Sequence, residues 1–263
     1  MSLCIAAACH VNGKGHVVLS HDWKITEGDA SSENTDKQGF VKRGWPALYA
    51  GITPDMDLIG DVFWDHLRSI AITEDNIEPE LQAARAKFKA ALIDRDLRGR
   101  IGMGYEEFMS RGKKAFRADE HRQMFDQMQR ELSQCEMLVA GVIDGDAYLF
   151  HVAESFAVPL DHFGTIGEGE AVASRWLHWR NQNDRLSLEQ TVLNVFEAQR
   201  FGSMTNTVGR QLSVYVLDHH GVVRQIHPLF KNKLERHYQS IKQQKGLPLT
   251  EQSFRKPPVE VVD

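Results

Sequence analysis

Residues 2–22 read SLCIAAACHVNGKGHVVLSHD. Residues 3–9 are small and apolar, which is typical of a buried strand. A turn over residues 12–15 leads into a second apolar run that ends near Asp22. Two such runs on either side of a turn predict a β-hairpin. The hairpin returns the chain towards its own start, so we expect Ser2 and Asp22 at the same end of it.

The rest of the chain places strands in hairpins and helices in consecutive pairs. Strands are expected at about residues 39–41, 47–51, 136–143, 147–152, 211–217 and 222–226. Helices are expected at about residues 53–70, in two pieces over 78–134, and at 170–180, 187–200 and 229–245, with loops at 26–36 and before 164. Paired helices between hairpins do not fit simple βαβ winding. The order favours an α+β fold, a four-layer αββα sandwich with two antiparallel sheets between helix layers.

The composition is that of an ordinary globular protein, with 42% hydrophobic and 25% charged residues among 263. We expect one domain over residues 1–263, with an enlarged helical segment at about 78–134 and a C-terminal helix and tail at about 229–263. A net charge of −5 gives no reason to expect nucleic acid as a partner. Three cysteines suggest a reducing compartment, and no targeting segment or run of about 20 apolar residues is visible. The prediction is a cytoplasmic protein without a membrane partner.

Ser2 directly follows Met1, and a small second residue generally permits removal of the initiator methionine. An exposed Ser2 would carry a hydroxyl nucleophile and a free α-amine on one residue. The unperturbed pKa of such an amine is about 8, close enough to neutrality for it to act as base for its own side chain. Lys37 would lower the pKa of that amine, and Asp22 would fix the position of the ammonium of Lys37. This chemistry requires no cofactor.

Two stretches resemble the proteasome β-type family of N-terminal-nucleophile hydrolases, which includes 20S proteasome subunits and bacterial proteasome-like proteases. Residues 15–24, GHVVLSHDWK, resemble the family's hydrophobic strand that ends in Asp-x-Arg/Lys. Residues 47–55, ALYAGITPD, resemble its strand, Ala-Gly turn and first helix. Counting back from this turn by the family's spacing reaches Lys37. The resemblance extends over most of the chain, and the segment at 78–134 is longer than usual.

By this resemblance Ser2 is the nucleophile, Lys37 tunes its amine, and Asp22 orients Lys37. The backbone N–H of Gly51 would donate to the oxyanion. The substrate would be a peptide or protein, and the chain would assemble into a homo-oligomeric ring, with an ATPase unfoldase as a possible partner. The positions that match the family's substrate pocket are Ile25, Thr35, Gly39, Tyr49 and Thr53.

Two residues of this site depart from the family. The usual nucleophile is threonine, and Glu168 stands where the family carries a serine that binds the nucleophile's amine. A carboxylate at that place would raise the pKa of the amine. Two other functions therefore remain open: a catalytically inactive structural member of the family, and a small-molecule amidase on the same fold.

Rival chemistries have weaker sequence signals. The twelve histidines include no His-Glu-x-x-His, so no metal site is expected. Cys4 would become an N-terminal nucleophile only after removal of three residues, and a structural strand cysteine is the preferred interpretation.

Overall fold

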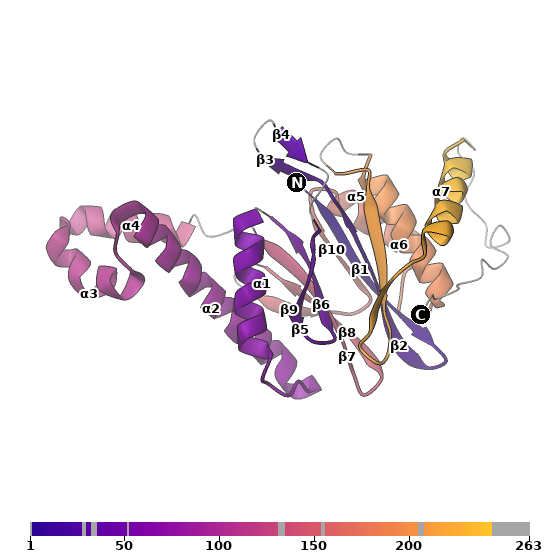
Figure 1. The fold of residues 1–263 in the computed structure, drawn as a ribbon, viewed down its shortest axis with the longest axis horizontal. Coiled ribbons are helices and arrows are strands. Elements are labelled where there is room, and N and C mark those ends of the chain that lie inside the picture. The colour runs from indigo at the N-terminus through magenta and orange to yellow at the C-terminus, as the bar shows by residue number, and fades with distance from the viewer. Residues whose placement is uncertain are drawn as a thin grey trace.

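Two five-stranded antiparallel sheets form the centre of the computed structural model, which describes residues 2–27, 30–32, 36–51, 53–130, 135–153, 156–204 and 208–243 (Figure 1). The first sheet consists, in spatial order, of β10 (Phe163–Gly167), β1 (Leu3–Val11), β2 (Lys14–Asp22), β11 (Leu212–Leu217) and β12 (Val223–Gln225). The second consists of β5 (Gln38–Lys42), β6 (Trp45–Ala50), β7 (Glu136–Ile143), β8 (Asp146–Val152) and β9 (Ala157–Leu160).

Helices cover both outer faces. The helices are α1 (Thr53–Leu67), α2 (Glu74–Ile101), α3 (Tyr105–Ala115), α4 (Ala118–Arg130), α5 (Glu170–Trp179), α6 (Leu188–Gly202) and α7 (Pro228–Gln243). One apolar cluster joins α1 and α2 to the second sheet, and another joins α5, α6 and α7 to the first sheet. A third cluster lies between the sheets, where Ala6 and Leu19 meet Leu48 and Leu138. The four-layer αββα prediction is therefore confirmed. No helix within the described ranges is both long and apolar enough to cross a membrane.

The predicted N-terminal hairpin is present as β1 and β2. Asn12 and Gly13 both have positive φ, of 53° and 76°, as a two-residue type I′ turn requires. The register pairs Val11 with Lys14 at the turn and Cys4 with His21 at the open end. The start of β1 and the end of β2 therefore lie together, and this geometry builds the candidate site.

The prediction of two helices over residues 78–134 is wrong, because the structure has three: α2, α3 and α4. Gly102 ends α2 in a left-handed conformation, with φ 71°, as expected from its sequence. A second break follows at Phe116, whose extended backbone ends α3. No glycine or proline marks that break, so the sequence pattern did not show it. Together α3 and α4 reach beyond the sandwich at the left of Figure 1.

Two predicted loops also contain strands. Residues 26–36 include part of a short hairpin of β3 (Ile25–Glu27) and β4 (Ala30–Ser32), and the segment before residue 164 contains β9 and the start of β10. The last two are edge strands: β9 pairs with β8, and β10 pairs with β1. Their short, mixed sequences acquire strand structure from these long-range partners, which a local pattern does not reveal.

Candidate active site

The carboxylate of Asp22 is fully buried at the end of β2 and accepts hydrogen bonds from four groups. Its Oδ1 accepts from the backbone N–H of Leu3 at 2.8 Å and from Nζ of Lys37 at 2.6 Å. Its Oδ2 accepts from the backbone N–H of Gly209 at 2.7 Å and of Lys24 at 3.3 Å. One carboxylate therefore ties the peptide that follows Ser2 to the ammonium of Lys37.

Lys37 is only 1% exposed, so its ammonium is held by the protein and not by solvent. Its backbone carbonyl accepts from the N–H of Tyr49 at 2.9 Å, which aligns it with β6. The preceding residue is fixed as well, because Asp36 Oδ1 lies 3.0 Å from Nε2 of the buried His21. This contact is the main reason why the pKa of Asp36 lies below its ordinary value. Lys37 is thus held in place by its backbone bond to β6 and by the contact of its neighbour Asp36 with β2.

Ser2 is 4% exposed and packs against the backbone of Gly167 at the end of β10. A Cβ at position 167 would lie 2.2 Å from the Ser2 carbonyl oxygen and 3.3 Å from its Oγ. Gly167 also has φ 92°, which L side chains rarely adopt. On the other side, the amide of Gln199 donates to the carbonyl of Leu3 at 3.1 Å. Glycine at 167 is therefore needed for the close approach of the two strand ends.

Gly51 follows β6 directly and has φ 148°. The thiol of Cys4 donates to the carbonyl of Tyr49 at 3.3 Å, and this bond joins the start of β1 to the end of β6. Gly51 thus lies at the same end of the sandwich as Ser2. Burial raises the pKa of Cys4 far above its ordinary value, with a partly opposing effect of the Lys37 ammonium. A thiol that stays protonated is a poor nucleophile, in agreement with a structural role for Cys4.

Glu168 lies in the turn between β10 and α5 and is exposed. Within the described ranges its side chain forms no hydrogen bond or ion pair. The structure therefore brings Ser2, Asp22, Lys37 and Gly51 to one end of the sandwich and places Glu168 next to Gly167 without joining it to them.

A cavity of about 700 Å³ lies between α1 and the strands β5 and β6. Gly39 and Tyr49, two of the predicted pocket residues, line it. Ile25 and Thr53 are described by their backbone alone, in β3 and at the start of α1, and Thr35 lies outside the described residues. The residues that line this α1 cavity are Asp36, Gln38, Gly39, Phe40, Tyr49, Met56, Asp57, Gly60, Asp61 and Trp64.

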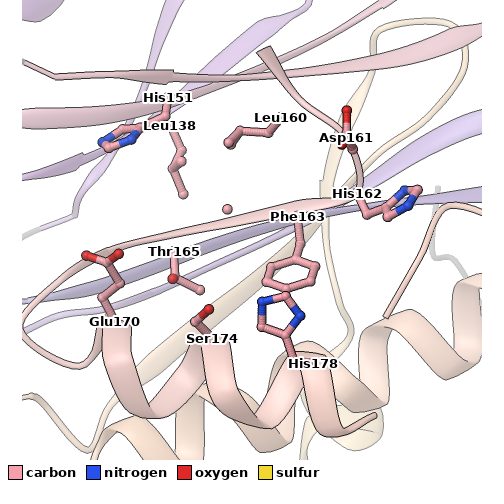
Figure 2. A pocket seen from close by; sticks show the side chains of 11 residues that line it. Leu138, His151, Leu160, Asp161, His162, Phe163, Thr165, Glu170, Ser174 and His178 are labelled. Atoms are coloured by element: carbon pink, nitrogen blue, oxygen red, sulfur yellow. The ribbon is translucent and has the colours of Figure 1, made fainter. Parts of the chain in front are cut away.

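A second cavity, of about 350 Å³, lies between α5 and strands of the second sheet (Figure 2). Successive turns of α5 present Glu170, Ser174 and His178 to it, and His151 lies across from Glu170. Burial, and then the charge of Glu136, raises the pKa of Glu170. His178 packs edge-on against the ring of Phe163, and among the described residues Ser174 and His178 form no hydrogen bond with each other. None of the predicted catalytic residues lines this cavity.

Several residues of the site were not predicted. The N–H of Gly209 binds Asp22, the His21–Asp36 contact fixes the residue before Lys37, and Gly167 packs against Ser2. The Gly-x-Gly run at 167–169 was a usable signal, because such a run after an apolar stretch indicates a backbone that needs positive φ or close approach. The partners of Asp22 and Asp36 come from long-range folding and left no local signal.

Two antiparallel sheets between helix layers, with Ser2 at one end of the sandwich, define a four-layer αββα fold. Among solved structures, the chain is similar to the Anbu (Gly-1) mutant from Hyphomicrobium sp. strain MC1, with a TM-score of 0.60. The match covers 95% of this chain and 100% of that chain at 13% sequence identity. No protein-family model matches the sequence, and no curated protein matches it. A likeness at this identity shows the shared fold, and the activity must be argued from the site.

Proposed function

We propose that this chain is a proteasome-type peptidase that cleaves peptide bonds with the hydroxyl of Ser2 after Met1 is removed. The observation that carries the proposal is the position of the buried Asp22–Lys37 pair. Asp22 Oδ1 accepts both from Lys37 Nζ and from the N–H of Leu3, the peptide directly after Ser2. A buried ion pair of this kind is a weak source of stability, so its placement beside the chain start favours a functional role.

The proton acceptor in this proposal is the α-amine of Ser2. The ammonium of Lys37 lowers the pKa of the amine, because two positive charges close together are unfavourable. Asp22 holds the Lys37 side chain in place without contacting the substrate. In its free-base form the amine takes the proton of the Ser2 hydroxyl as the hydroxyl attacks the scissile carbonyl.

The remaining steps follow those of other acyl transfers. The N–H of Gly51 donates to the oxyanion of the tetrahedral intermediate. The amine then gives its proton to the leaving nitrogen, the C–N bond breaks, and an ester forms on Ser2. Water, activated by the same amine, hydrolyses the ester. Glu168 is exposed and makes no contact with these residues in the structure; its proposed role is to bind the amine in its protonated form, and that contact would raise the amine's pKa.

We extend the proposal to assembly, with peptides or unfolded proteins as substrates. A homo-oligomeric ring would enclose the site, and an ATPase unfoldase would feed it. The support is the proteasome-like fold alone. The mass of the native assembly, measured by light scattering, tests the ring.

The first experiment is the intact mass of protein produced with its native start, before and after incubation with a peptide epoxyketone. This probe reacts with both the hydroxyl and the free amine of an N-terminal nucleophile. The expected result is loss of Met1 and one adduct per chain, with no adduct in Ser2→Ala. Retention of Met1 without adduct would overturn the proposal and favour the inactive structural member. An adduct on a monomer that hydrolyses acyl amides but no peptide would favour the small-molecule amidase.

A further inference from the structure

The α1 cavity is acidic at its rim and contains no basic lining residue among those described. Asp57 and Asp61 are one turn apart on α1. Asp36, two residues before β5, adds a third carboxylate. Asp57 and Asp61 are exposed and form no ion pair within the described part of the chain. The nearest lysine in sequence, Lys37, is already committed to Asp22. Asp36 is already in contact with His21, so the negative charge that no described group pairs is that of Asp57 and Asp61.

Aromatic side chains surround the same space. Trp64 and Phe40 line the cavity and are 40% and 42% exposed, which is unusual for such large apolar groups. Exposed aromatic faces beside carboxylates form a suitable site for a cation, because the ring face attracts positive charge. A planar guanidinium gains more from this arrangement than an ammonium, since it also stacks on the rings.

The inner wall of the cavity carries a second polar signal. Tyr49 lines the cavity and is only 6% exposed. Its hydroxyl lies against Gly39 and Gly60, where added Cβ atoms would be 2.9 and 3.3 Å from it. Among the described residues this hydroxyl has no hydrogen-bond partner, and it is not one of the enclosed side-chain atoms that lack a partner, so it is open to the cavity. The Tyr49 hydroxyl can therefore accept a hydrogen bond from a ligand in the cavity.

We infer that the α1 cavity binds a basic side chain of the substrate, arginine ahead of lysine. Asp57 and Asp61 attract the cation, Trp64 and Phe40 stack against it, and the Tyr49 hydroxyl accepts a hydrogen bond from it. The cavity begins at residues 36 and 38, on either side of Lys37, so it lies next to the proposed catalytic pair. This inference rests on the proposed function: if the chain is a peptidase, it should cleave bonds adjacent to a basic residue.

The binding step can be tested without catalysis in the Ser2→Ala variant. We would label the five tryptophans with 5-fluorotryptophan, assign Trp64 by its loss in Trp64→Phe, and titrate N-acetyl-arginine amide while recording ¹⁹F spectra. The expected result is a saturable shift of the Trp64 signal, weaker for the lysine amide and absent for the leucine amide. The dissociation constant should rise about threefold in Asp61→Asn and about tenfold in Asp57→Asn/Asp61→Asn.

The matched control is Asp65→Asn, which changes an exposed carboxylate on the same helix outside the cavity. It should leave the dissociation constant unchanged. Equal binding of the leucine and arginine amides, or an unmoved Trp64 signal, would overturn the inference.

A cleavage assay separates this inference from the proposed function. The hydrolysis of peptidyl-aminomethylcoumarins with arginine, lysine or leucine before the scissile bond is measured for the wild type and for the double Asn variant. Preference for arginine that falls about tenfold in the double variant supports both statements. Hydrolysis that favours leucine overturns the inference and leaves the peptidase intact. Arginine-amide binding without hydrolysis of any substrate supports the cavity and overturns the peptidase.

Discussion

Carboxylate–cation pairs occur in two very different settings in this molecule. The Asp22–Lys37 pair at the end of the sandwich is 0% and 1% exposed, and its N–O distance is 2.6 Å. The Glu107–Arg111 pair on α3 is 46% and 76% exposed, with a distance of 3.4 Å. Residues of α3 reach beyond the sandwich, where solvent screens their charges (Figure 1). A carboxylate and a cation are therefore shielded from solvent in the first region and surrounded by it in the second.

The difference shows what each pair can contribute. An exposed pair gains little, because water already solvates both charges. A buried pair gains little net stability either, since desolvation offsets the attraction, but loss of one partner leaves an uncompensated charge in the interior. Loss of the exposed pair on α3 should therefore cost little, whereas the buried pair fixes two groups beside Ser2.

The largest predicted effect follows from breaking the buried pair. Lys37→Met removes the cation and leaves the Asp22 carboxylate without its charged partner. We expect the free energy of unfolding to fall by about 3–5 kcal/mol. The matched exposed variant, Arg111→Met, should change it by less than about 0.5 kcal/mol. Urea denaturation followed by circular dichroism measures both.

A double variant tests the reason for this loss. Asp22→Asn/Lys37→Met removes both charges, so it should regain part of the stability lost in Lys37→Met. The gain is partial, because the amide nitrogen of Asn cannot accept from the N–H groups of Gly209 and Lys24 that bind Asp22 Oδ2. If the double variant is less stable than either single variant, desolvated charge is not the cause, and the packing of the lysine stem must be considered.

The next effect compares two glycines with positive φ, Gly167 beside Ser2 and Gly102 at the end of α2. An alanine at either position adopts a left-handed backbone, which costs about 1–2 kcal/mol. At Gly102 the added Cβ meets nothing within 4 Å, but at Gly167 it would lie 2.2 Å from the Ser2 carbonyl. Because overpacking adds about 1–3 kcal/mol, Gly167→Ala should be clearly the more destabilised of the two.

Thermal and urea unfolding of the two glycine variants provide the comparison. Equal losses would mean that the chain start moves away from Gly167 at little cost. That outcome would contradict a rigid position for Ser2. Under the proposed function, Gly167→Ala should also lose reaction with the epoxyketone, and Gly102→Ala should retain it.

Much of the fold could be predicted because its signals are local. The β1–β2 hairpin follows from two apolar runs and a turn, and the start of α6 from Ser187, whose side chain accepts from the N–H of Gln190 at 3.3 Å. The place of Lys37 came from spacing within a family resemblance, and the structure puts its ammonium on Asp22. Local periodicity and ordered spacing were sufficient for these elements.

The remaining features depend on partners far along the chain. Asp22 accepts a hydrogen bond from the N–H of Gly209, 187 residues later in the chain. The strand β10 pairs with β1, about 160 residues earlier. The acidic α1 cavity likewise requires one face of α1 to meet β5 and β6. Such contacts depend on how the layers close, and no short pattern in the sequence encodes them.

The smallest predicted effect concerns the support of the buried pair by Asp36. The pKa of this carboxyl lies below its ordinary value of 3.8, first because of the contact with His21. A carboxyl with a lowered pKa in the folded state stabilises the protein above its ordinary pKa and loses that contribution as the pH falls through the folded pKa. Asp36 is half-exposed, with 51% of its side chain accessible, so solvent reduces the effect.

Asp36→Asn should therefore lower the urea midpoint slightly at pH 6, and the difference from wild type should shrink as the pH is lowered towards 3. Asp65→Asn, at an exposed carboxylate of α1, should leave the midpoint within error of the wild type. A difference that stays constant or grows in acid would show that Asp36 acts by packing and not by its charge. In that case the region around Lys37 would depend on the buried pair alone, and the contrast with the exposed pairs on α3 would become sharper.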